Sequence, residues 1–233
     1  MNHPQATRDM SGHTEPTRVL AMRHGETAWN VDTRIQGQLD IGLNAKGRWQ
    51  AERVGAALAQ EDISVVYSSD LCRAYDTALS IAQPHGLVVQ TDEGLRERGF
   101  GEFEGKTFTD IEAAWPEQAL QWRKRVPDYT PPGGESLLQL RERVVPCVQA
   151  LAQRHVGQHI AVVAHGGVMD MLYRAATGLD LQAPRSWDLH NAAINRLLWN
   201  GEHFTIVGWA DASHLDDAVY AALQGTARDE TTT

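Results

Sequence analysis

The stretch Leu20-Ala-Met-Arg-His-Gly-Glu-Thr-Ala-Trp-Asn30 decides the fold of this chain. The apolar run from Arg18 to Met22 predicts a short buried strand, which then breaks into Arg23-His24-Gly25. In open α/β sheets, ligands bind at the carboxyl ends of the strands. Gly25 has no Cβ, so the backbone there can approach a ligand closely. A cation, an imidazole and a glycine at such a strand end indicate a turn that binds an anion.

The rest of the chain alternates between patterns typical of strands and of helices. Apolar or β-branched runs predict further strands, at 63–67, 87–91 and 160–164, and a hairpin of 191–199 and 203–209 that turns at Asn200-Gly201. Spacing and capping residues predict helices over 44–60, 71–82, 109–125 with a break at Pro116, 136–155 and 166–176. This alternation predicts an α/β fold with a mostly parallel central sheet flanked by helices.

Composition limits the function. The 233 residues fit one domain, and 42% hydrophobic and 22% charged residues are ordinary for a soluble globular protein. A net charge of −9 argues against nucleic acid as a partner, and no apolar run reaches the length of a membrane span. The polar start has no secretory h-region, and the two cysteines match no metal or redox spacing, so a cytoplasmic protein is expected.

Three of the predicted strands lead into a cation or an imidazole. Arg23 and His24 follow the first strand, Arg73 follows the second within the first turn of a helix, and His165 follows the strand ending at Ala164. Parallel strands joined by right-handed crossovers bring these ends to one rim of the sheet. Two arginines and two histidines there suit a phosphate dianion, because the planar guanidinium matches phosphate oxygens in pairs. A metal site is disfavoured, because a cation adjoins His24 and no HxH or HExxH spacing occurs.

Several stretches also resemble the blocks of one family. The motif Arg-His-Gly-Glu-Thr-x-Trp-Asn closely resembles the signature of the histidine phosphatase superfamily, which includes the cofactor-dependent phosphoglycerate mutases. Four more segments of this chain resemble further blocks of the family, at 68–78, 95–105, 164–167 and 191–197. The resemblance implies a phosphoglycerate mutase-like three-layer α/β sandwich. It implies one catalytic domain at 18–217 with a lid region at about 100–135. The polar composition of 1–17 predicts a flexible N-terminal extension, and 218–233, with Gly225 and three terminal threonines, is expected to form a tail.

The resemblance assigns roles to particular residues. It implies His24 as the nucleophile that forms a phosphohistidine, Glu97 as the proton donor, and His165 as a catalytic residue of the phosphate clamp. It implies that Arg23 and Arg73 bind phosphate and that Asn30 and the backbone of Gly166 add to the clamp. Gln36 and Gly37, in a polar loop next to the site, are expected to touch the substrate. The enzyme is expected to need no cofactor and no metal. For Glu97 an ion pair with a neighbouring arginine is the alternative, and His190 is a further candidate for the pocket wall.

The same site can run two reactions, depending on whether water or a second hydroxyl accepts the phosphoryl group. Pro-Gly-Gly-Glu-Ser at 132–136 and Ala-His-Gly-Gly at 164–167 resemble the phosphatase branch. Glu97-Arg98 resembles the Glu-Arg pair of the mutases and Trp122-Arg123-Lys124 resembles their Trp-Arg-Arg, but Phe108 stands near the position where a mutase has lysine. We therefore expect a phosphomonoesterase acting on a small phosphorylated metabolite. A 2,3-bisphosphoglycerate-dependent mutase is the alternative, followed by a non-catalytic protein that binds phosphorylated ligands. The substrate, the oligomeric state and the role of the cluster Arg123-Lys124-Arg125 stay open.

Overall fold

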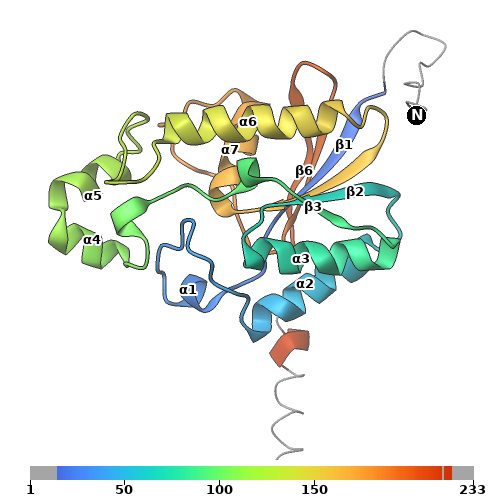
Figure 1. Cartoon of the computed structure of the whole chain (residues 1–233), viewed down its shortest axis with the longest axis horizontal. Helices are drawn as coiled ribbons and strands as arrows, with labels where there is room; N and C mark the ends of the chain where they lie inside the picture. Colours follow the sequence, from blue (N-terminus) through green and yellow to red (C-terminus); the bar gives the residue numbers. More distant parts are fainter. Residues whose placement is uncertain (1–14, 217, 222–233) are drawn as a thin grey trace, which may run out of the picture.

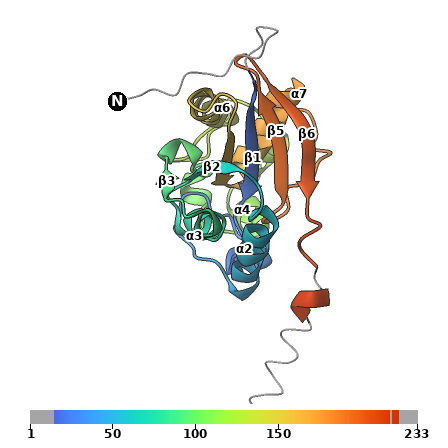
Figure 2. The same cartoon turned by 90° about the vertical axis from the view of Figure 1, so that its right-hand side faces the viewer.

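The computed structural model describes residues 15–216 and 218–221, and its centre is a six-stranded sheet in the order β3-β2-β4-β1-β5-β6. The strands are β1 (Thr17–Arg23), β2 (Ile63–Ser68), β3 (Val89–Thr91), β4 (His159–Ala164), β5 (Ile194–Trp199) and β6 (Phe204–Asp211). The first four are parallel to one another, whereas β5 pairs antiparallel with β1 and β6 with β5. Figure 2 shows β3 at one edge and the β5–β6 hairpin at the other. The predicted mostly parallel sheet is confirmed.

Helices cover both faces of the sheet. One face of β1, β2 and β4 packs with α6 (Leu137–Gln153) and α7 (Gly166–Thr177) around a core that includes Val162 and Leu172. The other face packs with α2 (Ala45–Leu58) and α3 (Cys72–Ala82) around Met22 and Val66. Figure 1 shows α6 above the sheet and α2 and α3 below it. The predicted three-layer sandwich is therefore confirmed, with alternate residues of each central strand buried in opposite cores.

The predicted caps set the helix ends. Asn44 accepts a hydrogen bond from the peptide of Gly47, and Ser136 forms a capping box with Gln139 at the start of α6. Pro116 separates α4 (Phe108–Ala114) from α5 (Pro116–Arg123). The hairpin turns at Asn200, whose side-chain oxygen accepts from the peptides of Glu202 and His203. The third strand is shorter than the predicted 87–91 and begins at Val89. An apolar run by itself does not define the residue at which a strand begins.

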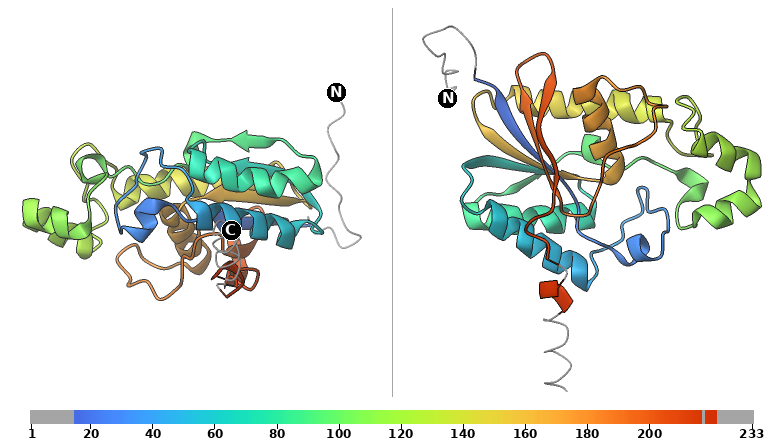
Figure 3. Two further views of the ribbon diagram at one scale, coloured as in Figure 1. Left: turned by 90° about the horizontal axis from the view of Figure 1, so that it is seen from below. Right: turned by 180° about the vertical axis from the view of Figure 1, so that it is seen from behind.

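The part predicted as a lid has a small core of its own. Phe103, Ile111 and Ala119 are buried there, among partly buried aromatic side chains that include Phe100 and Trp122. The segment comprises η3 (Gly101–Phe103), α4 and α5, and Figures 1 and 3 place α4 and α5 beyond the end of the sheet where β1 leads into α1. The remaining 3-10 turns are η1 (Gln83–His85) and η2 (Glu93–Leu95). This segment therefore stands over the strand ends where the anion site is expected.

The structure describes part of the extension and part of the tail that were expected before and after the domain. Thr17, which the sequence analysis assigned to the extension, begins β1; its side chain is buried and donates to the carbonyl of Ala152 at 2.8 Å. Residues 1–14 of the expected extension lie outside the described part. Of the expected tail, 218–221 form a helical turn in which Tyr220 contacts Trp49, and 222–233 lie outside the described part. Among the described residues, no helix is long and apolar enough to cross a membrane.

Candidate active site

The two histidines meet because β1 and β4 are neighbouring parallel strands. Arg23 is in register with Ala164, and the peptide of His24 donates to the carbonyl of Ala164 at 3.0 Å. The imidazole rings of His24 and His165 lie 5.2 Å apart between centroids and are tilted by 59°. Both side chains are buried, at 2% and 0% exposure. The predicted convergence of the strand ends is thus present at these two positions.

The ring of His24 is held in one orientation. Its Nδ1 lies 2.7 Å from the carbonyl oxygen of Gly25, and because a carbonyl can only accept, Nδ1 carries the proton. Nε2 is therefore the ring nitrogen with a free lone pair. Burial lowers the pKa of His24 well below its ordinary value, and the nearby Arg23 and Arg73 lower it further. A neutral imidazole with an unprotonated Nε2 is the form that can attack phosphorus.

Arg73 lies at the start of α3 and is wholly buried. Its two Nη atoms donate to the carbonyls of Leu39 and Gly37, at 2.8 and 2.7 Å. Arg23 donates from Nη1 to the carbonyl of Leu189 at 2.7 Å. These contacts fix both guanidinium groups but leave the Nε atom of each without a partner among the described residues.

His165 has a similar gap in its bonding. Both of its ring nitrogens are buried and have no hydrogen-bond partner among the described residues. Burial lowers its pKa well below the ordinary value, followed by the charges of Arg73, His24 and Arg23. Buried polar atoms in native proteins are nearly always satisfied, so a cluster of unsatisfied ones around His24 indicates where a polar ligand binds. Donors on Arg23, Arg73 and His165 suit an anion.

Glu97 reaches this cluster from the loop after η2. Its Oε1 accepts from the peptides of Arg98 and Gly167, at 2.8 and 3.1 Å, and its Oε2 lies 3.1 Å from the same Gly167 nitrogen. A Cβ built on Gly166 would stand 3.8 Å from Oε2 and 3.6 Å from Arg23 Nε, which places all three groups together. Among the described ion pairs none involves Glu97, so its partners are peptides and not the arginine of the alternative interpretation.

The other expected site residues differ in what they contact. Asn30 accepts from the peptide and hydroxyl of Thr27 at the start of α1 (Ala28–Val31), a short helix that the sequence analysis missed. Gly37 contributes the carbonyl that holds Arg73, at a left-handed φ of 54°. Gln36 is buried, with its Oε1 unpaired in the described part. His190 is 59% exposed beside Asp188 and lines a cavity together with Lys46 and Gln50, and Arg23 lines the same cavity.

Gly25 serves packing, and the expected reason for it is wrong. A Cβ there would overlap the carbonyl oxygen of Gly47 in α2, so the close approach is to a helix and not to a ligand. Its peptide donates to the hydroxyl of Thr77, which in turn donates to the carbonyl of Arg73. Asn191 donates to the carbonyl of His24 at 2.8 Å. Thr77 was missed as a support of the site, because its only signal was its place one helical turn after Arg73.

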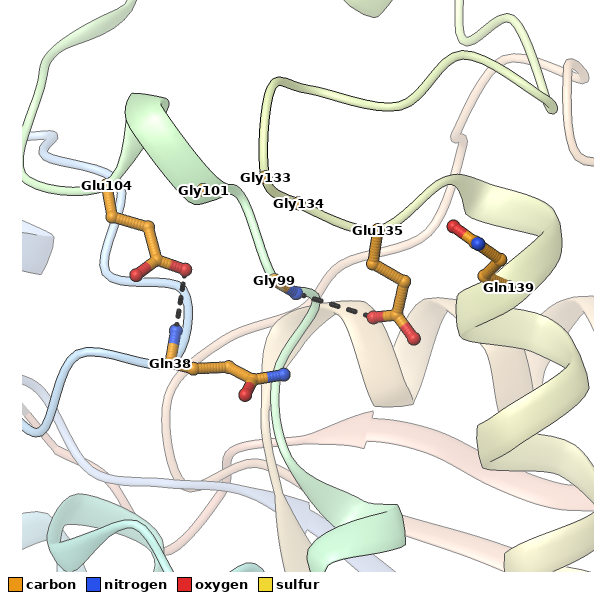
Figure 4. A pocket seen from close by; sticks show the side chains of 8 residues that line it. All are labelled: Gln38, Gly99, Gly101, Glu104, Gly133, Gly134, Glu135 and Gln139. Atoms are coloured by element: carbon orange, nitrogen blue, oxygen red, sulfur yellow. Dashed lines mark hydrogen bonds between the residues drawn. The ribbon is translucent and has the colours of Figure 1, made fainter.

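Two further cavities lie near these groups, and the charged side chains that line them differ. A cavity of about 250 Å³ is lined by Arg23, Glu97 and Gly166 together with Arg98, Phe100, Trp122, Arg125, Leu137, Leu140, Gly167, Asp170, Met171, Arg185 and Leu189. The larger pocket of Figure 4 contains Gln38, Glu104 and Glu135 among its glycines. There Glu104 accepts from the peptide of Gln38 at 3.0 Å, and Glu135 from that of Gly99 at 3.4 Å. Carboxylates repel phosphate, so of these two the arginine-lined cavity fits an anionic substrate better.

Comparison with known proteins agrees with this geometry. The family model of the histidine phosphatase superfamily, branch 1, matches residues 19–212. "Phosphoglycerate mutase-like protein 4" of Arabidopsis thaliana is 41% identical over 203 residues, covering 85% of this chain and 87% of that protein. The "metal-independent phosphoserine phosphatase" of the same plant is 36% identical over 211 residues, covering 89% and 87%. A solved mycobacterial glucosyl-3-phosphoglycerate phosphatase superposes with a TM-score of 0.75 at 34% identity, covering 84% of this chain and 99% of that one. The chain belongs to the histidine phosphatase superfamily, branch 1.

Proposed function

We propose that this enzyme is a phosphomonoesterase that transfers the phosphoryl group of a small metabolite to His24 and then to water. One observation carries the proposal: the buried, unpaired nitrogens of Arg23, Arg73 and His165 surround an imidazole whose Nε2 is free. Phosphoryl transfer is catalysed mainly by positioning and by stabilising negative charge on the equatorial oxygens, which is what such donors do. The phosphatases among the relatives support the hydrolytic reading.

The residues fit a two-step reaction. In the first step, His24 Nε2 forms a bond to phosphorus as the ester oxygen leaves, and Glu97 gives that oxygen its proton. In the second step, Glu97 takes a proton from water as the water oxygen bonds to phosphorus and the bond to Nε2 breaks. Phosphate is released and His24 returns to its neutral form. The first step needs Glu97 protonated and the second needs it ionised, so one carboxyl serves as acid and then as base.

The mutase alternative has the names of several relatives in its favour, and Arg98 of its Glu-Arg pair lines the cavity, but Arg123 and Lys124 of the other mutase-like motif do not. Arg123 pairs with Glu112 at 2.8 Å, and its side chain is 57% exposed. Its guanidinium also lies over the ring of Phe108, which packs in turn against Trp122. Lys124 is exposed. This placement favours water over a second sugar-acid hydroxyl as the acceptor.

The test is to trap the intermediate. Phosphohistidine survives in alkali and decays in acid, so an alkaline quench during turnover of a ³²P-labelled phosphomonoester should leave label on the peptide that contains His24. His24→Asn should carry none, and label on His165 or on a serine would overturn the mechanism. An assay of 3-phosphoglycerate with 2,3-bisphosphoglycerate distinguishes the reactions, because a mutase forms 2-phosphoglycerate there and a phosphatase releases inorganic phosphate.

The cytoplasm is the compartment that we propose. Cys72 and Cys147 are both free thiols, and neither is fully buried. Free cysteines persist in a reducing compartment, whereas secreted proteins of this size tend to pair them. Thiol titration of protein isolated under anaerobic conditions should count two reduced cysteines.

A further inference from the structure

One arginine outside the catalytic cavity holds the loop that carries Glu97. Arg143, on α6, is not among the residues that line the cavity of Glu97 and Arg23. Its Nη1 donates to the carbonyls of Gly94 and Arg96, both at 3.0 Å, and its Nη2 donates to the carbonyl of Glu97 itself at 3.3 Å. One guanidinium group therefore binds three carbonyls within four consecutive residues of this loop.

The remaining donors of Arg143 bind a carboxylate. Nε donates to Oε1 of Glu135 at 2.9 Å, and Nη2 donates to Oε2 at 2.8 Å. This is the bidentate, charge-assisted arrangement of a guanidinium and a carboxylate. A guanidinium has five N–H groups, and all five of them have an acceptor here. A lysine ammonium has three donors and no planar fork, so it cannot reproduce this set of contacts.

Glu135 lies where the chain returns from the predicted lid, and it is bonded to the loop of Glu97 as well. Its peptide donates to the carbonyl of Gly99 at 2.7 Å, and its carbonyl accepts from Arg98 Nε at 2.7 Å. Figure 4 shows its carboxylate beside Gly99, whose peptide donates to Oε2 at 3.4 Å. The pair of Arg143 and Glu135 thus joins α6, the returning strand of the lid and the loop of Glu97.

Apolar packing already attaches this loop to α6. Leu95 is 0% exposed and lies in the same core as Val144 and Val148 of that helix. The side chain of Arg143 is 25% exposed, in contrast, and contributes little to this core. The loop should therefore stay in place when Arg143 is replaced. What the arginine adds is the orientation of the peptide from which the side chain of Glu97 extends.

We infer that Arg143 is a positioning residue of the reaction, and that with Glu135 it fixes the backbone of Glu97 so that the carboxyl meets the ester oxygen. This inference rests on the proposed role of Glu97 as the proton donor. The carbonyl of Glu97 is held by Arg143, and its carboxylate accepts from the peptide of Gly167 at 3.1 Å, so both ends of the residue are fixed. A displacement of about 1 Å in a catalytic group can cost about 100-fold in rate, so such support matters.

The test compares two substrates that differ in their need for a proton. Arg143→Gln should lower kcat/KM for an alkyl phosphate, glycerol 3-phosphate, by about 10- to 100-fold. It should leave p-nitrophenyl phosphate within about threefold, because that leaving group departs without a proton. Arg143→Lys should recover little of the loss, because it restores the charge without the five donors. Full recovery with lysine would show that only the charge matters, and would overturn the positioning role.

A double variant tests whether Arg143 acts through Glu97. In the Glu97→Gln background, Arg143→Gln should lower kcat/KM for glycerol 3-phosphate by no more than about twofold further, because the group that it positions has already been lost. Multiplication of the two single effects would overturn the inference. A Glu97→Gln variant that loses equally on both substrates would instead refute the proposed proton donor, so the two failures are distinguishable.

The control is Arg141→Gln, on an exposed arginine of the same helix, which should change neither substrate. Melting curves of every variant show whether the fold is kept. If Arg143→Gln is unstable, Glu135→Gln serves in its place, because it keeps one acceptor oxygen for the guanidinium and its peptide bonds to the loop. It should lose activity on glycerol 3-phosphate alone, by a smaller factor. Equal losses on both substrates would indicate a structural role and overturn the inference.

Discussion

The peptide N–H of Gly167 lies 3.1 Å from both oxygens of the Glu97 carboxylate, so the first turn of α7 holds the proposed proton donor in place. His165, the cap residue of that helix, stands two residues earlier. The same helix start therefore positions both the phosphate clamp and the acid.

Glu97→Gln should affect substrates according to their leaving groups. The variant keeps the size and one acceptor oxygen but has no proton to give. An alkyl phosphate needs that proton because its alkoxide is a poor leaving group, so kcat/KM should fall by about 100-fold or more. p-Nitrophenyl phosphate should lose much less, because its leaving group departs as a stable anion. Steady-state assays on both substrates, with a melting curve, make the comparison.

A structural role for Glu97 predicts a different pattern. Both substrates would then fall by the same factor, and the melting temperature would drop with them. In that case Glu102 and Glu104 become the next candidates for the acid, although Glu104 already accepts from the peptides of Gln38 and Phe100.

Gly167→Ala tests the positioning of the carboxylate. A Cβ there would overlap Glu97 Oε1 and stand 3.3 Å from Leu140 Cδ2, so the carboxylate must move. We expect kcat/KM for an alkyl phosphate to fall by about 10- to 100-fold, since small displacements of a catalytic group are costly. Gly42→Ala is the matched control, because a Cβ at Gly42 would meet nothing within 4 Å. Equal activity of the two variants on the alkyl phosphate would show that Glu97 is not held through Gly167.

The sequence predicted the site better where it depends on strand ends than where it depends on loops. His24 and His165 converge because the strands before them are parallel neighbours, which a strand-end argument anticipates. Arg73 was predicted to lie at the site for the same reason, because it also follows a parallel strand. Gly25 was assigned to ligand approach, but its contact with α2 arises from tertiary packing that local sequence does not encode. The cluster of Arg125, Asp170 and Arg185 comes from three separate segments, so only the folded chain brings it together.

Removal of metal ions should leave the activity unchanged. The donors around His24 are guanidinium and imidazole groups, and the described residues hold no cluster of three or more His, Cys, Asp or Glu side chains arranged to bind a metal. The positive charge that a phosphate needs is supplied by Arg23 and Arg73. We therefore expect full kcat after prolonged dialysis against EDTA, and inhibition by vanadate. Loss of activity on chelation that zinc or magnesium restores would contradict the assignment of the charge to arginine.

Protonation of the buried histidines should make the free enzyme less stable in acid. Burial and the neighbouring arginines lower the pKa values of His24 and His165 in the folded state, whereas both sit near about 6.5 in the unfolded chain. Below that pH the unfolded state binds more protons, so the free energy of unfolding falls as the pH falls, by up to about 1.4 kcal/mol per pH unit for each group. His165→Asn should flatten the slope between about pH 5 and 7 in urea titrations. A slope that His165→Asn leaves unchanged would mean that His165 does not titrate on unfolding, and that the remaining slope comes from His24, His159 and His214, whose pKa values burial also lowers.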